Sequence, residues 1–418
     1  MKKREVWLVI LLVFFGFLYQ AIQKGKIHLA EDFSFFSAEK KLKGSQFVEF
    51  PENEKVFSNV GKIEVENPAG EVVISKSGDD KVHISSSLRI YYTNKSDVDE
   101  IHKQILIKSE LQNRELKISS QYANAFPYQR ARILLRLSVP QNIILGISNQ
   151  EGDTVIKDTG KDILIDQENG NLILENIPSS LRLQLRNCNA NIKDIAANVD
   201  IVSSYANVFL ENAASLRFKG RHSDCSVKNV KKDVFIEHSY GKLTLDGIDK
   251  VEISARHCDI AAKNIRNGAV INNNYENVFL ENIGGDVRII CRLSKIDLHH
   301  VSCSNVVIEN SFADTNISDF SGTNLDMLLK NGNLELQVKN VSNRINIDSQ
   351  HAELNLYFGA LSDPTFNIKA KHGNIQVQSP LELDIYKENV DSFANRAGQK
   401  PEVLINNTYG NIQINTLK

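Results

Sequence analysis

The sequence lacks the residue patterns that several functional classes require. Its 418 residues include one Trp, two Met and five Cys, and no CxxC pair occurs. Lys and Arg total 49 against 51 Asp and Glu, so no excess of positive charge argues for nucleic acid as a partner. Few aromatic residues and many β-branched residues favour strands over a helical core.

The first 25 residues differ from the rest of the chain. A basic segment at positions 2–4 precedes a run from Val6 to Tyr19 in which Gly16 is the only residue outside the apolar and aromatic set. No small-x-small cleavage site follows, so we expect residues 1–25 to form an uncleaved, single-pass membrane anchor with its basic flank inside. The alternative is a signal peptide that is cleaved despite its poor site. Either way, we expect a cell-membrane protein with most of the chain extracytoplasmic, in the periplasm or at the cell surface.

Internal repetition organises most of the remaining sequence. The string Val-Phe-Leu-Glu-Asn begins at Val208 and again at Val278. Aligned on such strings, apolar residues form four columns at relative positions 0, 2, 9 and 11 of a unit of about 18 residues. The first column holds Leu145, Ile163, Leu181, Val199, Leu216, Val234, Val251, Ala269, Val287, Val306, Leu325, Ile345, Phe366 and Val403.

Each unit therefore contains two short alternating segments, which indicates strands with one buried face. A single pair of strands cannot bury that face, whereas stacked coils can. We predict an all-β fold, a single-stranded parallel β-helix (solenoid) over residues 145–418 with coils of about 18 residues. Left-handed hexapeptide helices fit the columns poorly, and the calcium-binding β-roll, which has a similar half-coil, needs a GGxGxD turn that is absent here. A polar stretch at 381–401 reads as a loop inserted before the last coil.

A smaller unit precedes the repeat. Apolar residues at 63, 65, 72 and 74 fit all four columns, so one coil-like unit is expected there. A short helix with Ser96 as its N-cap is predicted near 96–105, between strand-like runs at 82–92, 106–111, 115–120 and 131–139. The predicted organisation is an anchor (1–25), a linker (26–57), a strand-rich lead-in (58–144) and the solenoid (145–418) with its inserted loop.

These features resemble a known family. The run Arg-Ile-Leu-Leu-Arg-Leu-Ser-Val-Pro at 132–140 is followed by Gly-Asx-hydrophobic steps that begin at Gly152, Gly170 and Gly373. Over residues 58–418 the sequence resembles the bacterial putative-adhesin family of unknown function, related to the GIN-domain group. The resemblance implies a right-handed β-helix in the cell envelope, and it carries no catalytic residues. In some coils another residue replaces the glycine: Ala206, Ser223, Cys258 and Glu276.

Two patterns invite a chemical interpretation. His299 and His300, with Cys291 and Cys303 nearby, form the only compact group of soft metal ligands. Neighbouring side chains on a strand diverge, so we predict no metal and no cofactor. Carboxylates share one turn column with many asparagines, a composition better explained by local hydrogen bonding to the backbone than by catalysis. We therefore predict no catalytic residues and no enzyme. The carboxylates are Asp153, Asp224, Asp259 and Asp314.

A candidate binding edge lies three residues before the third apolar column. Coils stack at about 4.8 Å, so rings at this position would form a row along one edge of the solenoid. Such a row would bind sugars or a partner protein; alternatively, the rings stack on one another and shield the turns. The residues are Tyr205, His222, Tyr240, His257 and Tyr275.

The leading interpretation is a non-catalytic cell-envelope solenoid that acts as an adhesin-like binding or scaffolding module. It is attached to the membrane by its anchor and takes a protein or glycan ligand, with no nucleic acid. The alternatives are a carbohydrate-active β-helix enzyme and a purely structural or polymer-forming envelope protein.

The repeat register makes two further predictions. Cysteines 188, 225, 258 and 291 lie two coils apart in succession, about 9.6 Å at strand spacing, which exceeds the roughly 7 Å that a disulfide spans. We therefore predict no disulfide among these four, and a Cys291–Cys303 bond remains open. Three residues after the third column the charge alternates in sign from coil to coil: Glu175, Lys193, Glu211, Lys228, Asp246, Lys263, Glu281 and His299.

Overall fold

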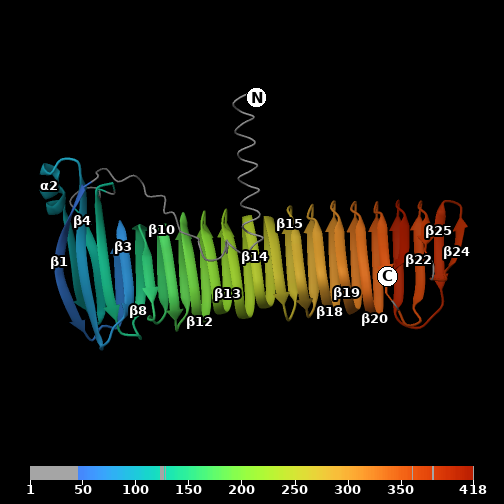
Figure 1. Ribbon diagram of the computed structural model, residues 1–418, viewed down its shortest axis with the longest axis horizontal. Helices are drawn as coiled ribbons and strands as arrows, with labels where there is room; N and C mark the ends of the chain where they lie inside the picture. The colour runs from blue at the N-terminus through green and yellow to red at the C-terminus, as the bar shows by residue number, and fades with distance from the viewer. Residues whose placement is uncertain (1–45, 123–126, 128, 360, 379–380, 418) are drawn as a thin grey trace, which may run out of the picture. The chain divides into compact units, whose positions relative to one another are not determined.

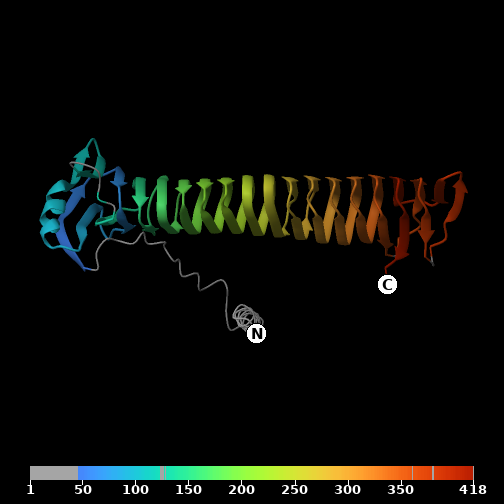
Figure 2. The same ribbon diagram turned by 90° about the horizontal axis from the view of Figure 1, so that it is seen from above.

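The computed structural model describes residues 46–122, 127, 129–359, 361–378 and 381–417. The predicted anchor and most of the predicted linker lie outside these residues. Within them, no helix has both the length and the apolar character needed to cross a membrane. The described residues form one compact unit, a β-solenoid whose coils follow one another in a single row (Figures 1 and 2).

The lead-in forms one end of the stack and contains the one helix of the described residues. Its elements are β1 (Gln46–Ser58), β2 (Lys62–Asn67), β3 (Gly70–Lys76), β4 (Lys81–Tyr92), α2 (Ser96–Gln104), β5 (Ile105–Gln112), β6 (Glu115–Tyr122) and β7 (Ala131–Val139). Lys95 takes the N-cap position of α2, so the prediction of Ser96 as the cap was wrong by one residue. Val98 and Ile101 are the buried residues of the helix.

The coil-like unit predicted at residues 63–74 is the first coil of the solenoid. Ile63 of β2 pairs in parallel with Leu145, and Val72 of β3 pairs with Thr154, although about 80 residues separate the partners in sequence. On the outer side of this coil, β6 pairs in parallel with β2, and β5 pairs antiparallel with β6. On the other face, β7, β4 and β1 continue outward from β3. The lead-in is therefore a cap built on the first coil.

The main stack is a parallel ladder in the predicted register. Its strands are β8 (Ile144–Glu151), β9 (Thr154–Lys157), β10 (Ile163–Ile177), β11 (Leu181–Arg186), β12 (Cys188–Ser204), β13 (Asn207–Arg221), β14 (Asp224–Ile265), β15 (Ala269–Asn274), β16 (Val278–Gly284), β17 (Val287–Arg292), β18 (Ile296–Ser311), β19 (Thr315–Lys330), β20 (Leu334–Gln350), β21 (Leu354–Phe358), β22 (Thr365–Lys371) and β23 (Ile375–Val377). Leu181, for example, pairs with Ile163 on one side and Val199 on the other.

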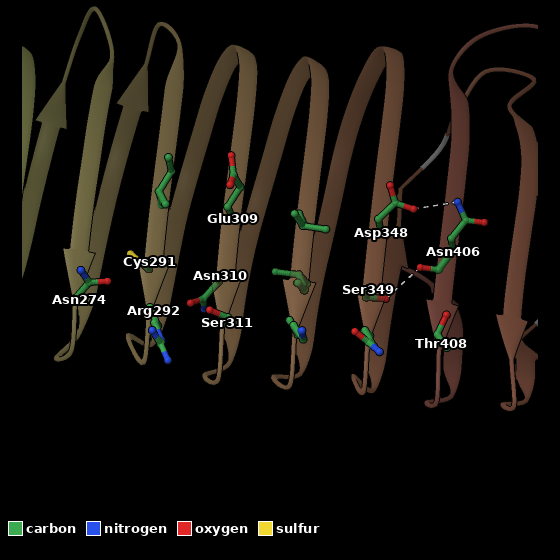
Figure 3. A pocket seen from close by; sticks show the side chains of 15 residues that line it. Asn274, Cys291, Arg292, Glu309, Asn310, Ser311, Asp348, Ser349, Asn406 and Thr408 are labelled. Carbon is green, nitrogen blue, oxygen red and sulfur yellow. Dashed lines mark hydrogen bonds between the residues drawn. The ribbon is translucent and has the colours of Figure 1, made fainter.

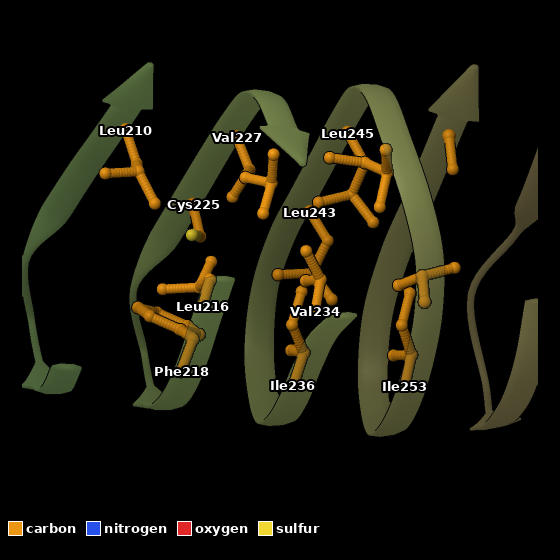
Figure 4. Packing of buried hydrophobic residues seen from close by; sticks show 14 of the residues in the cluster. Leu210, Leu216, Phe218, Cys225, Val227, Val234, Ile236, Leu243, Leu245 and Ile253 are labelled. Atoms are coloured by element: carbon orange, nitrogen blue, oxygen red, sulfur yellow. The ribbon is translucent and has the colours of Figure 1, made fainter. Parts of the chain in front are cut away.

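The apolar columns form the interior. Every residue of the first column is at most 2 % exposed. Figure 4 shows two opposing groups of this core, with Leu216 and Phe218 facing Cys225 and Val227. Burying one such aliphatic or aromatic side chain contributes about 1.5–3 kcal/mol. Coil stacking thus supplies the buried face that the alternating segments require.

Most coils turn at two left-handed residues. At one turn, the φ angles lie between +54° and +69°, and most positions hold Asn or Asp, which tolerate this conformation better than other non-glycine residues. Amides there donate from coil to coil: Asn176 Nδ2 to Asp158 Oδ1 at 3.0 Å and Asn212 Nδ2 to Asp194 Oδ1 at 2.7 Å. The other turn carries the predicted binding edge. The side-chain ladders therefore reinforce the backbone ladder.

The C-terminal end departs from sequence order. The last strands, β26 (Glu402–Thr408) and β27 (Ile412–Thr416), lie inside the stack. Val403 pairs with Ile345 on one side and with Phe366 on the other. The segment predicted as an inserted loop, 381–401, contains a hairpin of β24 (Asp384–Glu388) and β25 (Asp391–Arg396). Strand β25 pairs antiparallel with β22 and covers the outermost coil (Figure 1).

The register also places the cysteines and the charge column. All five cysteines are free and buried. In the charge column, the predicted neighbours Lys228 and Glu211 form an ion pair at 3.7 Å, and Lys263 and Glu281 form one at 2.6 Å. The column is not one continuous chain of ion pairs, because the Lys193 ammonium lies 5.7 Å from the centre of the Phe209 ring instead.

Candidate binding edge

The five ring residues proposed from the sequence lie in one row along the edge of the solenoid. Each occupies the left-handed position of its turn, with φ between +50° and +69°. Their rings are stacked nearly parallel, with successive centroid distances of 5.0, 4.8, 4.9 and 4.4 Å and interplanar angles of at most 13°. We call this row the ring ladder; its residues are Tyr205, His222, Tyr240, His257 and Tyr275.

Stacking decides which parts of the ladder remain accessible. Tyr205, Tyr240 and Tyr275 are 61 %, 44 % and 37 % exposed, so their rims face solvent. Each interior ring, however, has a neighbouring ring against both faces. A sugar that stacks on an aromatic side chain needs a free ring face, which the interior of the ladder does not offer. The accessible chemistry is therefore polar: tyrosine hydroxyls and imidazole nitrogens at the ring edges.

A second group of stacked rings continues the row toward the C-terminal end. Tyr409 stacks between His351 and His372, with centroid distances of 4.9 and 4.8 Å. This order follows from the inserted C-terminal strand, which brings residue 409 between two coils that precede it in sequence. Between the two groups the same turn position holds Leu293, Phe312 and Asn331. Rings of alternating type thus recur at both ends of one edge.

The carboxylates of the turn column are occupied by hydrogen bonds between coils. Asp153 Oδ1 accepts from the backbone N and the side-chain Nδ2 of Asn171, at 2.8 and 3.0 Å. Asp259 Oδ1 accepts from the same two groups of Asn277, each at 3.3 Å. Asp224 Oδ1 accepts from the backbone N of Lys242. These contacts agree with the hydrogen-bonding interpretation of the column, and they separate the carboxylates by coil steps instead of gathering them in one cleft.

The histidine pair does not form a cluster with its neighbouring cysteines. His299 Nδ1 contacts Ser318 Oγ at 2.6 Å, whereas His300 Nδ1 lies 2.8 Å from Asp319 Oδ2. Cys291 and Cys303 are buried, and burial raises the pKa of their thiols to about 11 and about 12, which keeps them protonated. Across residues 46–417, leaving out the masked positions, no group of three or more His, Cys, Asp or Glu is placed to hold a metal ion.

Sequence reasoning missed two open grooves on the outer face of the first-column strands. One, of about 670 Å³, lies over the coils around Val202, Arg217 and Phe235. The other, of about 500 Å³, lies over coils 287–408 and reaches the edge that carries the rings (Figure 3). Outward-facing positions on these strands share no residue type, so the column alignment gave no signal for them.

Comparisons with known proteins find a family model that matches the C-terminal part of the chain. Residues 219–415 match the family model described as Toastrack DUF4097, which confirms the resemblance to an adhesin-like family of unknown function. No curated protein matches the chain.

Three solved structures are similar to the chain. A putative cell adhesion protein from Clostridium sporogenes is 12 % identical, covers 88 % of this chain and 100 % of its own, and has a TM-score of 0.15. A putative adhesin from Parabacteroides distasonis is 11 % identical over 75 % of this chain and 98 % of its own, with a TM-score of 0.27. A putative lipid binding protein from the same organism is 11 % identical over 73 % and 96 %, with a TM-score of 0.23.

Proposed function

We propose, because residues 219–415 match the Toastrack DUF4097 family, that this chain is a non-catalytic binding module of the cell envelope. The observation that carries the proposal is the ring ladder. A rigid stack holds identical chemical groups at regular intervals along one exposed edge, and a partner that extends along the solenoid axis can contact many of them at once. The occupied carboxylates of the turn column give no comparable support to the carbohydrate-active enzyme.

The ends of the stack disfavour the polymer-forming alternative. At one end, the outer strand β1 contains Pro51 and a register shift between residues 52 and 55. At the other end, the hairpin strand β24 is exposed along its whole length and carries Asp384, Lys387 and Glu388. Proline, bulges and charged side chains are the devices by which edge strands avoid pairing with another chain. With the end strands β1 and β24 protected in this way, the sides of the solenoid are the surfaces left for binding.

Membrane attachment belongs to the same proposal. The basic flank and apolar run of residues 1–25 would hold the chain at the outer side of the cell membrane, with the solenoid outside the cytoplasm. The right-handed coil direction implied by the family resemblance is part of this proposal too. Isolation of a soluble form beginning near residues 22–31, in place of a membrane-bound form that retains its N-terminus, would replace the anchor with a cleaved signal peptide.

Binding by the purified full chain tests the proposal directly. The chain is applied to arrays of neutral and acidic glycans and to immobilised cell-envelope fractions, beside a variant with Tyr205→Ala, Tyr240→Ala and Tyr275→Ala. We expect binding of at least one surface and loss of that binding in the variant. The matched control replaces three outward residues away from the edge, Phe209, Phe235 and Phe279, by Ala. If no surface binds the parent chain, or if control and ladder variants lose binding equally, the ladder is only a structural element.

A further inference from the structure

A row of cations runs beside the ring ladder. The residue that directly precedes each ladder position is the last outward-facing residue of its strand. Between Arg186 and Lys371 this position holds no acidic residue. In spatial order the residues are Arg186, Ser204, Arg221, Ser239, Arg256, Asn274, Arg292, Ser311, Lys330, Gln350, Thr408 and Lys371. We call the six cations among them the basic row.

Register fixes the spacing of the basic row. Arg221 pairs across the ladder with Ser204 on one side and Ser239 on the other, and Arg292 pairs with Asn274 and Ser311. From Arg186 to Lys330, therefore, cations recur every second coil, about 9.6 Å apart at strand spacing. Figure 3 shows Arg292 in line with Ser311 and Thr408 beside the turns. The residues between the cations carry hydroxyl or amide groups, which bind hydroxyls and acidic groups alike.

Most of these cations have no acidic partner within the described solenoid, although the Arg292 guanidinium lies 5.7 Å from the centre of the Phe312 ring. In the part of the chain that the structure describes, no ion pair involves Arg221, Arg256, Arg292, Lys330 or Lys371. All five are exposed. Arg186 is the exception, because its guanidinium lies 3.4 Å from Glu168. A separation near the Debye length of about 8 Å at physiological salt keeps the repulsion between these cations small.

Two of the six cations of the basic row border the second groove. Arg292 and Lys330 line it together with Ser311, Gln350 and Thr408. Its two carboxylates already have partners: Glu309 pairs with Arg288 at 2.9 Å, and Asp348 accepts from Asn406 Nδ2 at 3.0 Å. The groove therefore presents cations and neutral hydrogen-bonding groups beside the ring edges, while Glu309 is paired with an arginine and Asp348 accepts a hydrogen bond from an amide.

We propose that the basic row and the ring ladder together bind an extended acidic polysaccharide along the solenoid axis. This inference rests on the proposed binding function and names its ligand class. A glycan chain with one carboxylate per disaccharide repeats its charge at a spacing comparable to two coils, so successive acidic groups meet successive cations. Its hydroxyls then meet the intervening Ser and Asn side chains and the tyrosine rims. Because the faces of the interior rings are covered by neighbouring rings, the sugar units cannot stack on them.

The charge pattern disfavours nucleic acid as the occupant. A nucleic-acid strand carries a phosphate every 3.4 Å or so along its axis, which is far denser than one cation per two coils. The full chain also has a net charge of −2, so the attraction is confined to this edge. An anionic membrane surface is the competing occupant that the experiment has to separate.

Hyaluronan, with one carboxylate per disaccharide, is the probe, and carboxyl-reduced hyaluronan is its neutral counterpart. Binding of the purified full chain to each is measured by biolayer interferometry. The test variant carries Arg221→Gln, Arg256→Gln and Arg292→Gln. The control carries Arg182→Gln, Arg217→Gln and Arg266→Gln, which remove the same number of exposed charges away from the basic row and the second groove. We expect hyaluronan alone to bind, the test variant to lose about tenfold in affinity and the control to change less than about threefold, since exposed charge contacts are individually weak. About 1 M NaCl should abolish binding.

The remaining outcomes count against the inference in distinguishable ways. Equal binding of both probes, or equal losses in the two variants, would overturn the role of the basic row. Binding to vesicles of phosphatidylglycerol without binding to hyaluronan would assign the edge to a membrane. If the chain binds neutral glycans or envelope fractions but not hyaluronan, the acidic ligand is wrong while the binding function stands. If it binds none of these surfaces, both proposals fail.

Discussion

The inserted C-terminal strand makes a prediction that no sequence-ordered solenoid shares. Ile405 is fully buried and pairs with Ile347 on one side and Ile368 on the other. Replacing it with Ala removes core packing between two coils at once. Large-to-small changes of this kind cost about 2–5 kcal/mol. Because the outermost coil is attached to the stack through β26, we expect Ile405→Ala to loosen residues 365–396 as well as 402–416.

Hydrogen exchange measured peptide by peptide reports this loosening. A loss of 2–5 kcal/mol raises the exchange of locally opening amides roughly 30-fold or more. We expect that increase in peptides covering β22 and β26, whereas peptides from β8 to β18 keep their protection. The matched control is Leu404→Ala, whose side chain is half-buried and points outward, and which should change exchange little.

One pattern would refute the reasoning. If the chain followed sequence order, Ile405 would belong to the outermost coil, and its loss would free 402–416 alone. Unchanged protection of residues 365–371 beside strongly increased exchange of 402–408 would therefore show that β26 does not lie between β20 and β22.

Three further predictions follow from burial and charge. Burial raises the pKa of the Cys303 thiol to about 12. A thiol reagent should therefore label Cys303 far more slowly in the native chain than in the unfolded chain, as measured by mass spectrometry. Equal labelling rates would contradict a buried thiol. Burial lowers the pKa of His238, and the unfolded chain therefore takes up the proton more readily, so stability should fall as the pH drops below the ordinary histidine value of about 6.5. In His238→Asn the difference in Tm between about pH 7.5 and 5.5 should shrink, and an unchanged difference would assign the acid sensitivity to other groups. Lys228→Glu should lower the free energy of unfolding by about 1 kcal/mol or less in urea titrations. Adding Glu211→Lys should not restore that free energy, because the new lysine lies beside Lys193. Full restoration would show that Glu211 and Lys228 act as an isolated pair.

The repeat could be predicted because burial, and nothing else, fixes it. A one-residue slip in a strand would turn its apolar side chains outward, so alternation together with constant spacing leaves one register. This logic predicted a coil-like unit at Ile63, a residue that pairs with Leu145 in the structure. Strands β4 and β7 of the lead-in could be predicted for the same reason, since buried and less buried residues alternate along most of each strand.

The order of the last coils could not be predicted in this way. Phe366 and Ile368 present the same pattern to their neighbours as Val403 and Ile405. Either order buries the same side chains against equivalent columns, so the apolar pattern does not distinguish them. The connection between β22 and β26 determines the order of these coils. Strand β25 in this connection pairs antiparallel with β22 and occupies the outer edge of β22. The chain can then continue only on the inner side.

The candidate site was likewise only partly predictable from the sequence. Position along the chain predicted that the rings share an edge, but their mutual stacking depends on side-chain torsions that the register does not set. The basic row was accessible in principle, because its residues stand at a constant offset of five from the first column. The alignment considered apolar columns and one charge column with alternating sign. In the column of the basic row, cations alternate with neutral residues, so the sign of the charge does not alternate and the column did not stand out.

The turn itself does not require aromatic residues, which bears on why the ladder exists. Asn187 and Asn331 occupy the same turn position, with φ of +50° and +54°. Asparagine and histidine adopt this conformation more readily than a bulky tyrosine does, so each Tyr there carries extra backbone strain. Ring stacking offsets part of it, at about 0.5–1.5 kcal/mol per aromatic pair. Asparagine would satisfy the turn without exposing so much of a ring, as it does at the opposite turn of several coils, for example at Asn176, Asn212 and Asn229. The rings therefore serve something beyond the fold of the turn, and their accessible hydroxyl and imidazole edges, beside unpaired cations, are the groups that a ligand would meet.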